Sequence, residues 1–266
     1  MKAEILRKEL EFSEDAKYYA DKEYVTNSML SLLNKSPQHL QMYFNGVKQE
    51  TPALNFGKAF HTVVLEPQKV DNEIAIFDGR SRRGKVWEEF LSINEGKTII
   101  TESEYNKILL MRKELVTPTE TWELIEESEH EVVRIWDMEN STEKGDIVKC
   151  KGKVDCVYTK PIGSKNVKVL VDVKTTQDCS PEAFKRTAYR YGYHRQAAFY
   201  LYGFNADEFW FAVVEKEAPY RTALYKASEE FIQRGREEIS ELLNKYTEYF
   251  IRKDKHVKEY YFKGEI

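Results

Sequence analysis

Two strand-like runs with a turn between them most constrain how this 266-residue chain can fold. The first run covers residues 151–157, the turn covers Pro161–Asn166, and the second run covers Val167–Thr176. Successive side chains of a strand point to opposite faces, so Asp172 and Lys174 share one face, roughly 6–7 Å apart along the strand. The other face is made by Val167, Val169, Val171 and Val173. The pattern predicts a β-hairpin that carries a carboxylate and an ammonium group side by side.

Asp155 in the first run adds a second carboxylate to this hairpin. It shares a predicted face with Lys151 and Lys153, and pairing of the two runs would place it diagonally across from Asp172, within reach of one metal ion. Carboxylate oxygens bind hard cations, and a lysine places a compact positive charge beside an attacking water. Two carboxylates and a lysine are the minimal set for magnesium-assisted hydrolysis of a phosphodiester.

The order Asp155, then Asp172-Val173-Lys174, resembles the D…(D/E)-x-K signature of the PD-(D/E)XK nuclease superfamily. Three further segments resemble motifs of its RecB-like and RecE-like branches, in the family's order. They are the histidine motif at Gly57–His61 with Leu65–Pro67, the acid-plus-strand element at Glu131–Trp136, and the glutamine–tyrosine helix at Tyr193–Tyr200. The resemblance covers about residues 20 to 255 and is to the nuclease domain of RecE-type (exonuclease VIII-like) phage and prophage exonucleases. Val154 departs from the signature's proline, and the middle acid is Asp rather than Glu.

This resemblance implies an α/β fold of the PD-(D/E)XK (restriction-endonuclease-like) type, a central mixed sheet flanked by helices with a helical N-terminal region. It implies a single nuclease domain over residues 1–266, with a helical accessory region at about 20–130 and a catalytic core at about 131–255. The pattern of elements agrees, since strands in the middle, a crossover helix and a further strand indicate an α/β sheet.

The resemblance also implies a metal-dependent deoxyribonuclease that uses Mg²⁺, with Mn²⁺ as a substitute. The implied reaction is 5′-to-3′ exonuclease digestion of linear double-stranded DNA, which leaves 3′ tails for recombination by single-strand annealing. The implied partners are DNA ends, a single-strand annealing recombinase and further copies of the chain, as in a tetrameric ring. Two other classes stay open: a site-specific or structure-specific endonuclease on the same fold, and a non-catalytic DNA-binding protein.

Individual residues take roles from the same resemblance. The predicted catalytic residues are Lys174, Asp155, Asp172, Glu131 and Gln196, and the predicted metal ligands are His61, Asp155, Asp172 and the carbonyl of Val173. For His61 the alternative is a hydrogen-bonded core residue, and for Glu131 it is one more acid in an acidic stretch. Tyr193 and Tyr200 share a helix face with Gln196 and are predicted to lie near DNA, although ordinary packing against the sheet stays open for Tyr200.

Net charge is −4, which is unfavourable for a DNA-binding protein, but the charges are uneven. An acidic stretch runs from Glu120 to Glu131. Local basic clusters can follow a phosphate backbone even when the whole protein is acidic, and arginine forks suit phosphate oxygens. The predicted DNA-binding arginines are Arg80, Arg82, Arg83, Arg190 and Arg195.

Composition narrows the remaining classes. No apolar run approaches the eighteen or so residues of a membrane span, and no signal-peptide pattern opens the chain. Three cysteines without paired spacing disfavour structural disulfides, a zinc site and an iron–sulfur cluster, so a cytoplasmic location is expected. Phosphate-loop, nucleophile-elbow and zinc-protease motifs are missing from the sequence.

Caps and periodicity predict the other elements. Helices are expected from Asn27, after Ser36-Pro37, and over Ala53–Leu65, Lys85–Ile93, Thr101–Val116, Glu120–Glu127, Ser180–Tyr189, Tyr193–Tyr202 and Glu229–Arg252. Strands are expected over Ile74–Phe77, Glu131–Met138, Ile147–Val157, Val167–Lys174, Glu208–Val214 and Thr222–Lys226. The segment Thr101–Glu104 has the pattern of a capping box.

Overall fold

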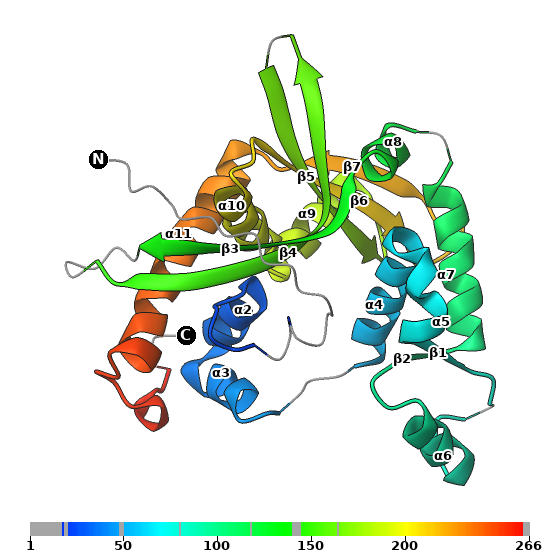
Figure 1. Cartoon of the computed structure of the whole chain (residues 1–266), viewed down its shortest axis with the longest axis horizontal. Helices are drawn as coiled ribbons and strands as arrows, with labels where there is room; N and C mark the ends of the chain where they lie inside the picture. The colour runs from blue at the N-terminus through cyan, green and yellow to red at the C-terminus, as the bar shows by residue number, and fades with distance from the viewer. Residues whose placement is uncertain are drawn as a thin grey trace.

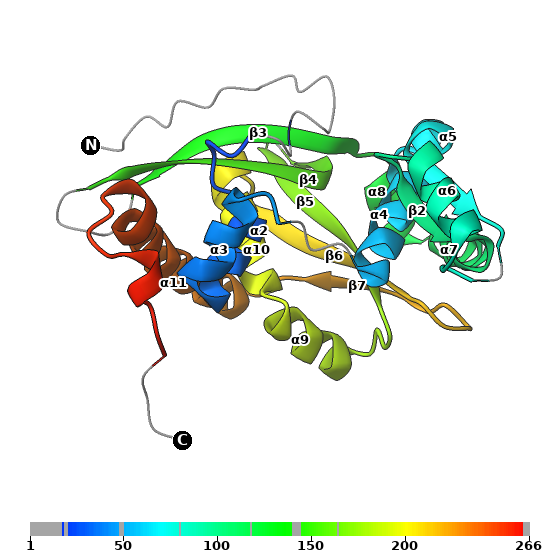
Figure 2. The ribbon, with the colours of Figure 1, turned by 90° about the horizontal axis from the view of Figure 1, so that it is seen from below.

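A mixed five-stranded sheet lies at the centre of the computed structural model, in the order β3-β4-β5-β6-β7, with helices on both faces (Figure 1, Figure 2). Its strands are β3 (Glu129–Glu139), β4 (Ile147–Ile162), β5 (Lys165–Thr176), β6 (Glu208–Glu215) and β7 (Thr222–Lys226). β5 and β6 run parallel, and the other neighbours run antiparallel. The predicted α/β fold is confirmed. The structure describes residues 18, 21–47, 51–79, 81–117, 119–139, 145–163 and 165–262.

The parallel pair β5 and β6 needs a crossover connection, because a hairpin can join only antiparallel strands. Two helices supply it, α9 (Pro181–Arg190) and α10 (Tyr193–Phe204). Gly192 between them has φ 71°, a left-handed conformation that glycine adopts without penalty. The helix break predicted near Gly192 is therefore confirmed.

The two faces of the sheet bury two separate cores. The first core packs the sheet against α9, α10 and three other helices, α2 (Asn27–Lys35), α3 (Pro37–Phe44) and α11 (Glu229–Tyr246). The second core packs the opposite face against α4 (Pro52–Leu65), α7 (Glu102–Leu115) and α8 (Glu120–Glu126). β5 contributes to both as its alternation predicts: Leu170 enters the first core, whereas Val169, Val171 and Val173 enter the second.

A smaller two-stranded sheet lies beside α4 and α7. β1 (Ile74–Phe77) pairs in parallel with β2 (Thr98–Thr101), and α6 (Lys85–Ile93) lies between them in the chain. A short 3₁₀ turn (Pro67–Lys69) and α5 (Val70–Glu73) precede β1. β2 was not expected, because its last residue, Thr101, is also the cap of α7 and was interpreted as the start of that helix. The capping box at Thr101 and Glu104 is confirmed.

The largest differences from the expected element bounds are at the hairpin turn and at the last helix. The hairpin turn narrows, because Pro161 pairs with Asn166 and Ile162 with Lys165. β4 and β5 are therefore longer than expected, and their hairpin extends beyond the helices that cover the sheet (Figure 1). The last helix is α-helical only to Tyr246 and continues as a π-helix over Thr247–Ile251, close to its expected end at Arg252.

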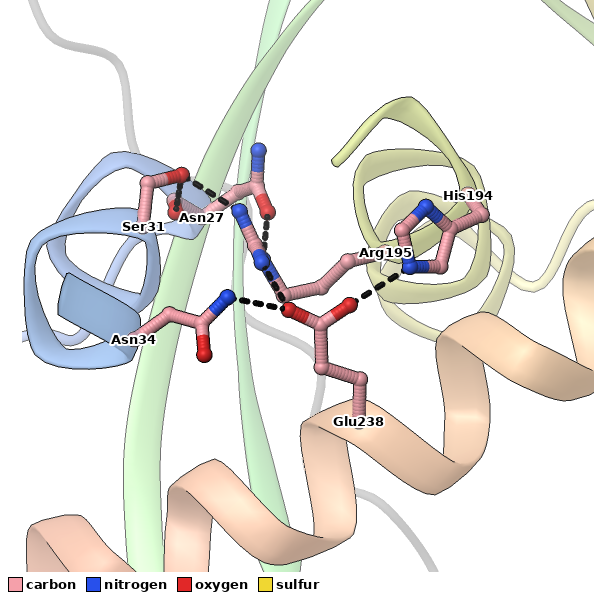
Figure 3. A network of polar contacts seen from close by, with 6 residues as sticks. All are labelled: Asn27, Ser31, Asn34, His194, Arg195 and Glu238. Carbon is pink, nitrogen blue, oxygen red and sulfur yellow. Dashed lines mark hydrogen bonds and ion pairs between the residues drawn. The ribbon is translucent and has the colours of Figure 1, made fainter. Parts of the chain in front are cut away.

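Arg195 lies in the protein interior, at the junction of α2, α10 and α11 (Figure 3). Its side chain is 2% exposed, pairs with Glu238, and donates to Asn27 Oδ1 at 3.1 Å and to Ser31 Oγ at 2.5 Å. Glu238 also receives a hydrogen bond from Asn34 at 2.8 Å. The prediction that Arg195 binds DNA is wrong, because a buried guanidinium with these partners joins three helices and cannot reach a phosphate.

Replacing Gly235 by alanine should destabilise the fold by about 1–3 kcal/mol, the usual cost of overpacking. Gly235 lies where α11 crosses α10, and a methyl group there would meet the backbone carbonyl oxygen of His194 at 2.1 Å. Gly57→Ala in α4 is the matched control, because no atom lies within 4 Å of its added methyl group. Urea denaturation should show the loss for Gly235→Ala only; equal stability of both variants would contradict this tight crossing.

Candidate active site

Strands β3 and β4 bend together where their acidic residues lie. Val154 packs in the first core but Cys156 packs in the second, so the alternation of β4 breaks at Asp155. On β3, Glu131 has φ 54°, and the pairs His130–Cys156 and Val132–Val154 on either side set it opposite Asp155. The shared bend therefore places two carboxylates next to each other.

His61 reaches these carboxylates from α4. Its Nδ1 lies 3.5 Å from Asp155 Oδ2, and one donor atom from each of His61, Glu131 and Asp155 lies within 4.8 Å of the others. Helix α4 is held by its apolar face, including Phe56, Ala59 and Phe60, in the second core. His61 lies at the edge of the buried face and points to the sheet.

Two carboxylate oxygens and an imidazole nitrogen fit a divalent cation, because Mg²⁺ and Mn²⁺ favour oxygen donors and imidazole suits several transition metals. This cluster of His61, Glu131 and Asp155 could hold such an ion. All three side chains are partly accessible, with 28% of His61 and 13% of Asp155 exposed. The three side chains therefore remain partly in contact with solvent.

Asp172 and Lys174 lie beside this cluster on β5. Lys174 Nζ is 2.5 Å from Asp172 Oδ2, and Gln196 of α10 donates to Asp172 Oδ1 at 2.7 Å. Asp172 and Asp155 follow directly after the last pair of β4 and β5, Cys156 with Val171, so they are direct neighbours rather than diagonal ones. The predicted face shared by Asp172 and Lys174 is observed.

Asp155 also connects the two strands where their ladder ends. Its Oδ2 accepts a hydrogen bond from the amide of Val173 at 2.7 Å. Val173 was predicted to offer its carbonyl to a metal; its backbone contact with the site is this amide. The carboxylate of Asp155 thus takes the place of a strand partner and is held in a defined position.

Burial and neighbouring charges separate the pKa values of the three acids. Burial raises the pKa of Asp172 to about 6, although Lys174 opposes the shift. Burial likewise raises the pKa of Glu131. For Asp155 burial acts in the same direction, but the charge and hydrogen bond of His61 outweigh it and lower the pKa. Asp155 is therefore the acid most strongly held in its charged form.

Lys153 is a further basic group at the site. Its ammonium pairs with the carboxylate of Glu131, and both side chains are largely buried, with 13% and 14% exposed. No role is predicted for Lys153 from the sequence, although its position two residues before Asp155 on the same strand is a signal for one. Lys151, on the same predicted face, points elsewhere and donates to the carbonyls of Tyr18 and Asp21.

The two predicted tyrosines have different surroundings. Lys174 Nζ lies 4.8 Å from the ring centroid of Tyr193, which places Tyr193 at the site. Tyr200 is 9% exposed and packs in the first core, where a methyl group on Gly152 would meet its ring at 2.7 Å. The prediction that Tyr200 contacts DNA is wrong, because its ring is covered by the sheet.

Of the remaining predicted arginines, the structure describes Arg82, Arg83 and Arg190. Arg82 pairs with Glu104, the capping residue of α7, so its guanidinium is already held by a carboxylate. Arg83 and Arg190 are exposed and stay predictions for DNA contact. Arg80 lies outside the described residues.

The metal-free protein should lose stability as pH rises from about 6.5 to about 9. Burial lowers the pKa of His61, but the charge of Asp155 outweighs this and raises the pKa from 6.5 to about 9. A raised pKa stabilises the folded state fully below 6.5, and this contribution disappears as pH passes 9. We expect a loss of up to about 3.5 kcal/mol, given about 1.4 kcal/mol per pKa unit. Chemical denaturation at pH 6 and 9.5 measures it, and an undiminished pH dependence in His61→Ala would assign the effect to other groups.

In the part of the chain that the structure covers, no helix has both the length and the apolar composition that crossing a membrane requires.

Comparisons with known proteins include a solved structure that is similar over nearly the whole chain. A search of curated proteins found no match. A crystal structure from Eubacterium rectale described as "Putative exonuclease" is similar, with a TM-score of 0.58 and 13% identity over 97% of this chain and 96% of that one. The structure of SSO0001 is less similar, with a TM-score of 0.36 and 14% identity over 82% and 76% of the two chains.

A family model, described as a PDDEXK-like domain of unknown function (DUF3799), matches residues 26–257. The match includes all the acids of the site and the strands that carry them. Together with the mixed sheet, it places the fold among the PD-(D/E)XK nucleases and supports a nuclease, without favouring the RecE branch. The chain belongs to this family of PDDEXK-like domains.

Proposed function

We propose that this protein is a metal-dependent exodeoxyribonuclease that digests linear double-stranded DNA from an end. The observation that carries the proposal is the joining of two groups: the cluster of His61, Glu131 and Asp155, and the pair of Asp172 and Lys174 beside it. The cluster has oxygen and nitrogen atoms that can bind a cation, and the pair has an ammonium group that Asp172 holds in place. Family membership supports a nuclease, and the similar structure described as an exonuclease supports digestion from an end.

In this proposal, each residue acts on the phosphodiester or on the attacking water. His61, Glu131 and Asp155 would hold a divalent cation, with Mg²⁺ the proposed ion and Mn²⁺ a substitute. Such a cation supplies Lewis-acid stabilisation of the charge that develops on a phosphodiester during hydrolysis. Lys174, whose pKa is raised because the Asp172 and Asp155 charges outweigh burial, stays protonated. Its ammonium orients the water and stabilises the developing negative charge.

Gln196 and Asp172 have supporting roles. Gln196 donates to Asp172, and Asp172 holds Lys174, so the ammonium has one defined position. Preorganised charge is effective in a partly buried site because it needs no rearrangement during the reaction. The polarity of digestion, 5′ to 3′ with 3′ tails for a single-strand annealing recombinase, rests on the resemblance to RecE-type exonucleases.

End-labelled linear duplex and closed circular DNA, incubated in parallel with Mg²⁺, Mn²⁺ or EDTA, test the proposal. We expect release of mononucleotides or short products from the linear duplex, intact circles, and no reaction in EDTA. Cutting of closed circles would identify an endonuclease instead. Binding of DNA without hydrolysis in either metal would identify a non-catalytic DNA-binding protein. The label at the 5′ or 3′ end gives the polarity.

Assembly into a closed ring of several copies, with four as in the resembling enzymes, is part of the proposal. A monomer of net charge −4 would hold long DNA weakly, because affinity follows the number of phosphates that the protein neutralises. A ring would gather the exposed Arg83 and Arg190 of several copies around one duplex. Light scattering at micromolar concentration gives the mass, and a monomer that digests long duplex distributively would exclude the ring.

Replacing Lys153 by methionine should slow cleavage about 10- to 100-fold, the usual effect of losing a group that orients a ligand. The neighbouring charge of Lys153 lowers the pKa of Glu131 against the effect of burial. Without it, Glu131 should hold its proton to higher pH, so the acidic limb of the pH–rate profile should move upward. Lys153→Arg should restore most activity. A uniform loss at every pH, unrelieved by arginine, would reduce Lys153 to a structural role.

A further inference from the structure

Tyr191 is a large aromatic side chain left in solvent close to the candidate active site. It follows the last residue of α9 and precedes the left-handed turn at Gly192, and it is 59% exposed. Single exposed apolar residues need no special explanation. Tyr191 differs from an ordinary exposed residue because neighbouring aromatic rings hold it in place and because the guanidinium of Arg190 lies near its ring.

A stack of rings fixes the position of Tyr191. Its ring lies 6.0 Å from that of Tyr193, with 28° between their planes, and Tyr193 lies 5.8 Å from Phe211 at 29°. Phe211 is 2% exposed and belongs to the first core. The stack therefore runs from the core to the surface and ends in a ring that solvent can reach.

The same stack connects Tyr191 to the reacting groups. Tyr193 lies 4.8 Å from Lys174 Nζ, so the two contacts together place the Tyr191 ring within about 11 Å of that ammonium. Bases along one strand of DNA follow one another every 3.4 Å or so. The ring is thus within about three nucleotides of a phosphate at Lys174.

Arg190 places a positive charge close to the ring of Tyr191. The guanidinium carbon of Arg190 lies 5.7 Å from the centroid of Tyr191, and the Arg190 side chain is exposed. An aromatic face for a base together with a cation for the adjacent phosphate is the combination by which proteins bind single-stranded nucleic acid.

We infer that Tyr191, with Arg190, is a stacking platform for an unpaired nucleobase at the DNA end. A paired base inside a duplex has both faces covered by its neighbours, so the ring can take only a base at the strand end, and an unpaired terminal base can turn onto it without carrying the other strand along. The inference rests on the proposed function and specifies its substrate: a strand end with one or more unpaired nucleotides near the scissile phosphate. The platform selects such an end without reading its sequence.

Binding without cleavage tests the platform. Lys174→Met protein, with Mg²⁺, is titrated into duplex DNA that ends in an unpaired 2-aminopurine, whose fluorescence falls when it stacks. With Tyr191 present, we expect quenching. Tyr191→Ala should abolish the quenching and weaken binding about 5- to 150-fold, which is a stacking contribution of about 1–3 kcal/mol converted at 1.4 kcal/mol per tenfold. Tyr191→Phe should retain both. Tyr261→Ala, which removes another exposed tyrosine, should change neither.

Cleavage supplies an independent measurement. In the protein with Lys174, Tyr191→Ala should raise KM for frayed ends more than it lowers kcat, and should remove the preference for frayed over GC-clamped ends. If the wild-type protein quenches the fluorescence but never cleaves DNA, the proposed function is wrong and the stacking platform is supported. Cleavage with no quenching, or equal quenching by the alanine variant, would overturn the platform and leave the nuclease proposal standing. Absence of both DNA binding and cleavage would overturn both.

Discussion

Asp155→Asn is expected to lower the rate of DNA cleavage by about 10³-fold or more. Asp155 is the residue on which the site converges: His61 lies 3.5 Å from its Oδ2, the Val173 amide donates to that same oxygen, and Glu131 lies opposite it. Asparagine preserves the size of the side chain and an acceptor oxygen but removes the negative charge. Loss of a charged group that acts directly on the reaction costs several powers of ten.

Single-turnover kinetics on end-labelled linear duplex measures this loss, and calorimetric titration with Mn²⁺ measures cation binding separately. Both should fall together, because in the proposed mechanism the carboxylate is a ligand of the cation, and its charge also holds His61 nearby. Asp254→Asn, at an exposed position, is the matched control and should leave both unchanged. Near-normal cleavage by a folded Asp155→Asn protein would remove the metal-ligand role.

Lys174→Met should reduce cleavage by about 10²- to 10⁴-fold while cation binding persists. The methionine fills much of the same space without an ammonium group, so the variant separates charge from packing. The Lys174 charge also lowers the pKa of Asp172, which burial holds at about 6. In the variant the pKa of Asp172 should rise further, and Asp172 should take up a proton at neutral pH. The residual activity should therefore increase with pH more steeply than in the wild type.

The measurements are a pH–rate profile and Mn²⁺ calorimetry on the same preparations. Lys174→Arg should recover only part of the rate, because a planar guanidinium cannot replace a compact ammonium at 2.5 Å from Asp172. Lys113→Met on the exposed side of α7 controls for the loss of a surface charge. Equal losses of cleavage and cation binding in Lys174→Met would mean that the lysine maintains the site instead of acting on the substrate.

Local patterns predicted most of the secondary structure and one half of the site. The alternation of β5 was sufficient to place Asp172 and Lys174 on one face, because neighbouring residues of a strand follow a period of two. Glycine at position 192 indicated the helix break, and Thr101 with Glu104 indicated a helix start, because both signals depend on a few adjacent residues. Resemblance to known motifs led from these elements to His61, Glu131 and Gln196.

Tertiary structure alone decided how those residues meet and which polar residues are buried. The bend at Glu131 and Asp155 breaks the alternation that the sequence implies, and it exists because the two strands must serve two different cores. Arginine and tyrosine are common in DNA-binding helices, yet packing turns Arg195 and Tyr200 inward. There Arg195 pairs with Glu238, and the ring of Tyr200 lies against Gly152. A period of 2 or 3.6 residues specifies relative directions within one element. Distances between elements depend on long-range packing, which no local pattern contains.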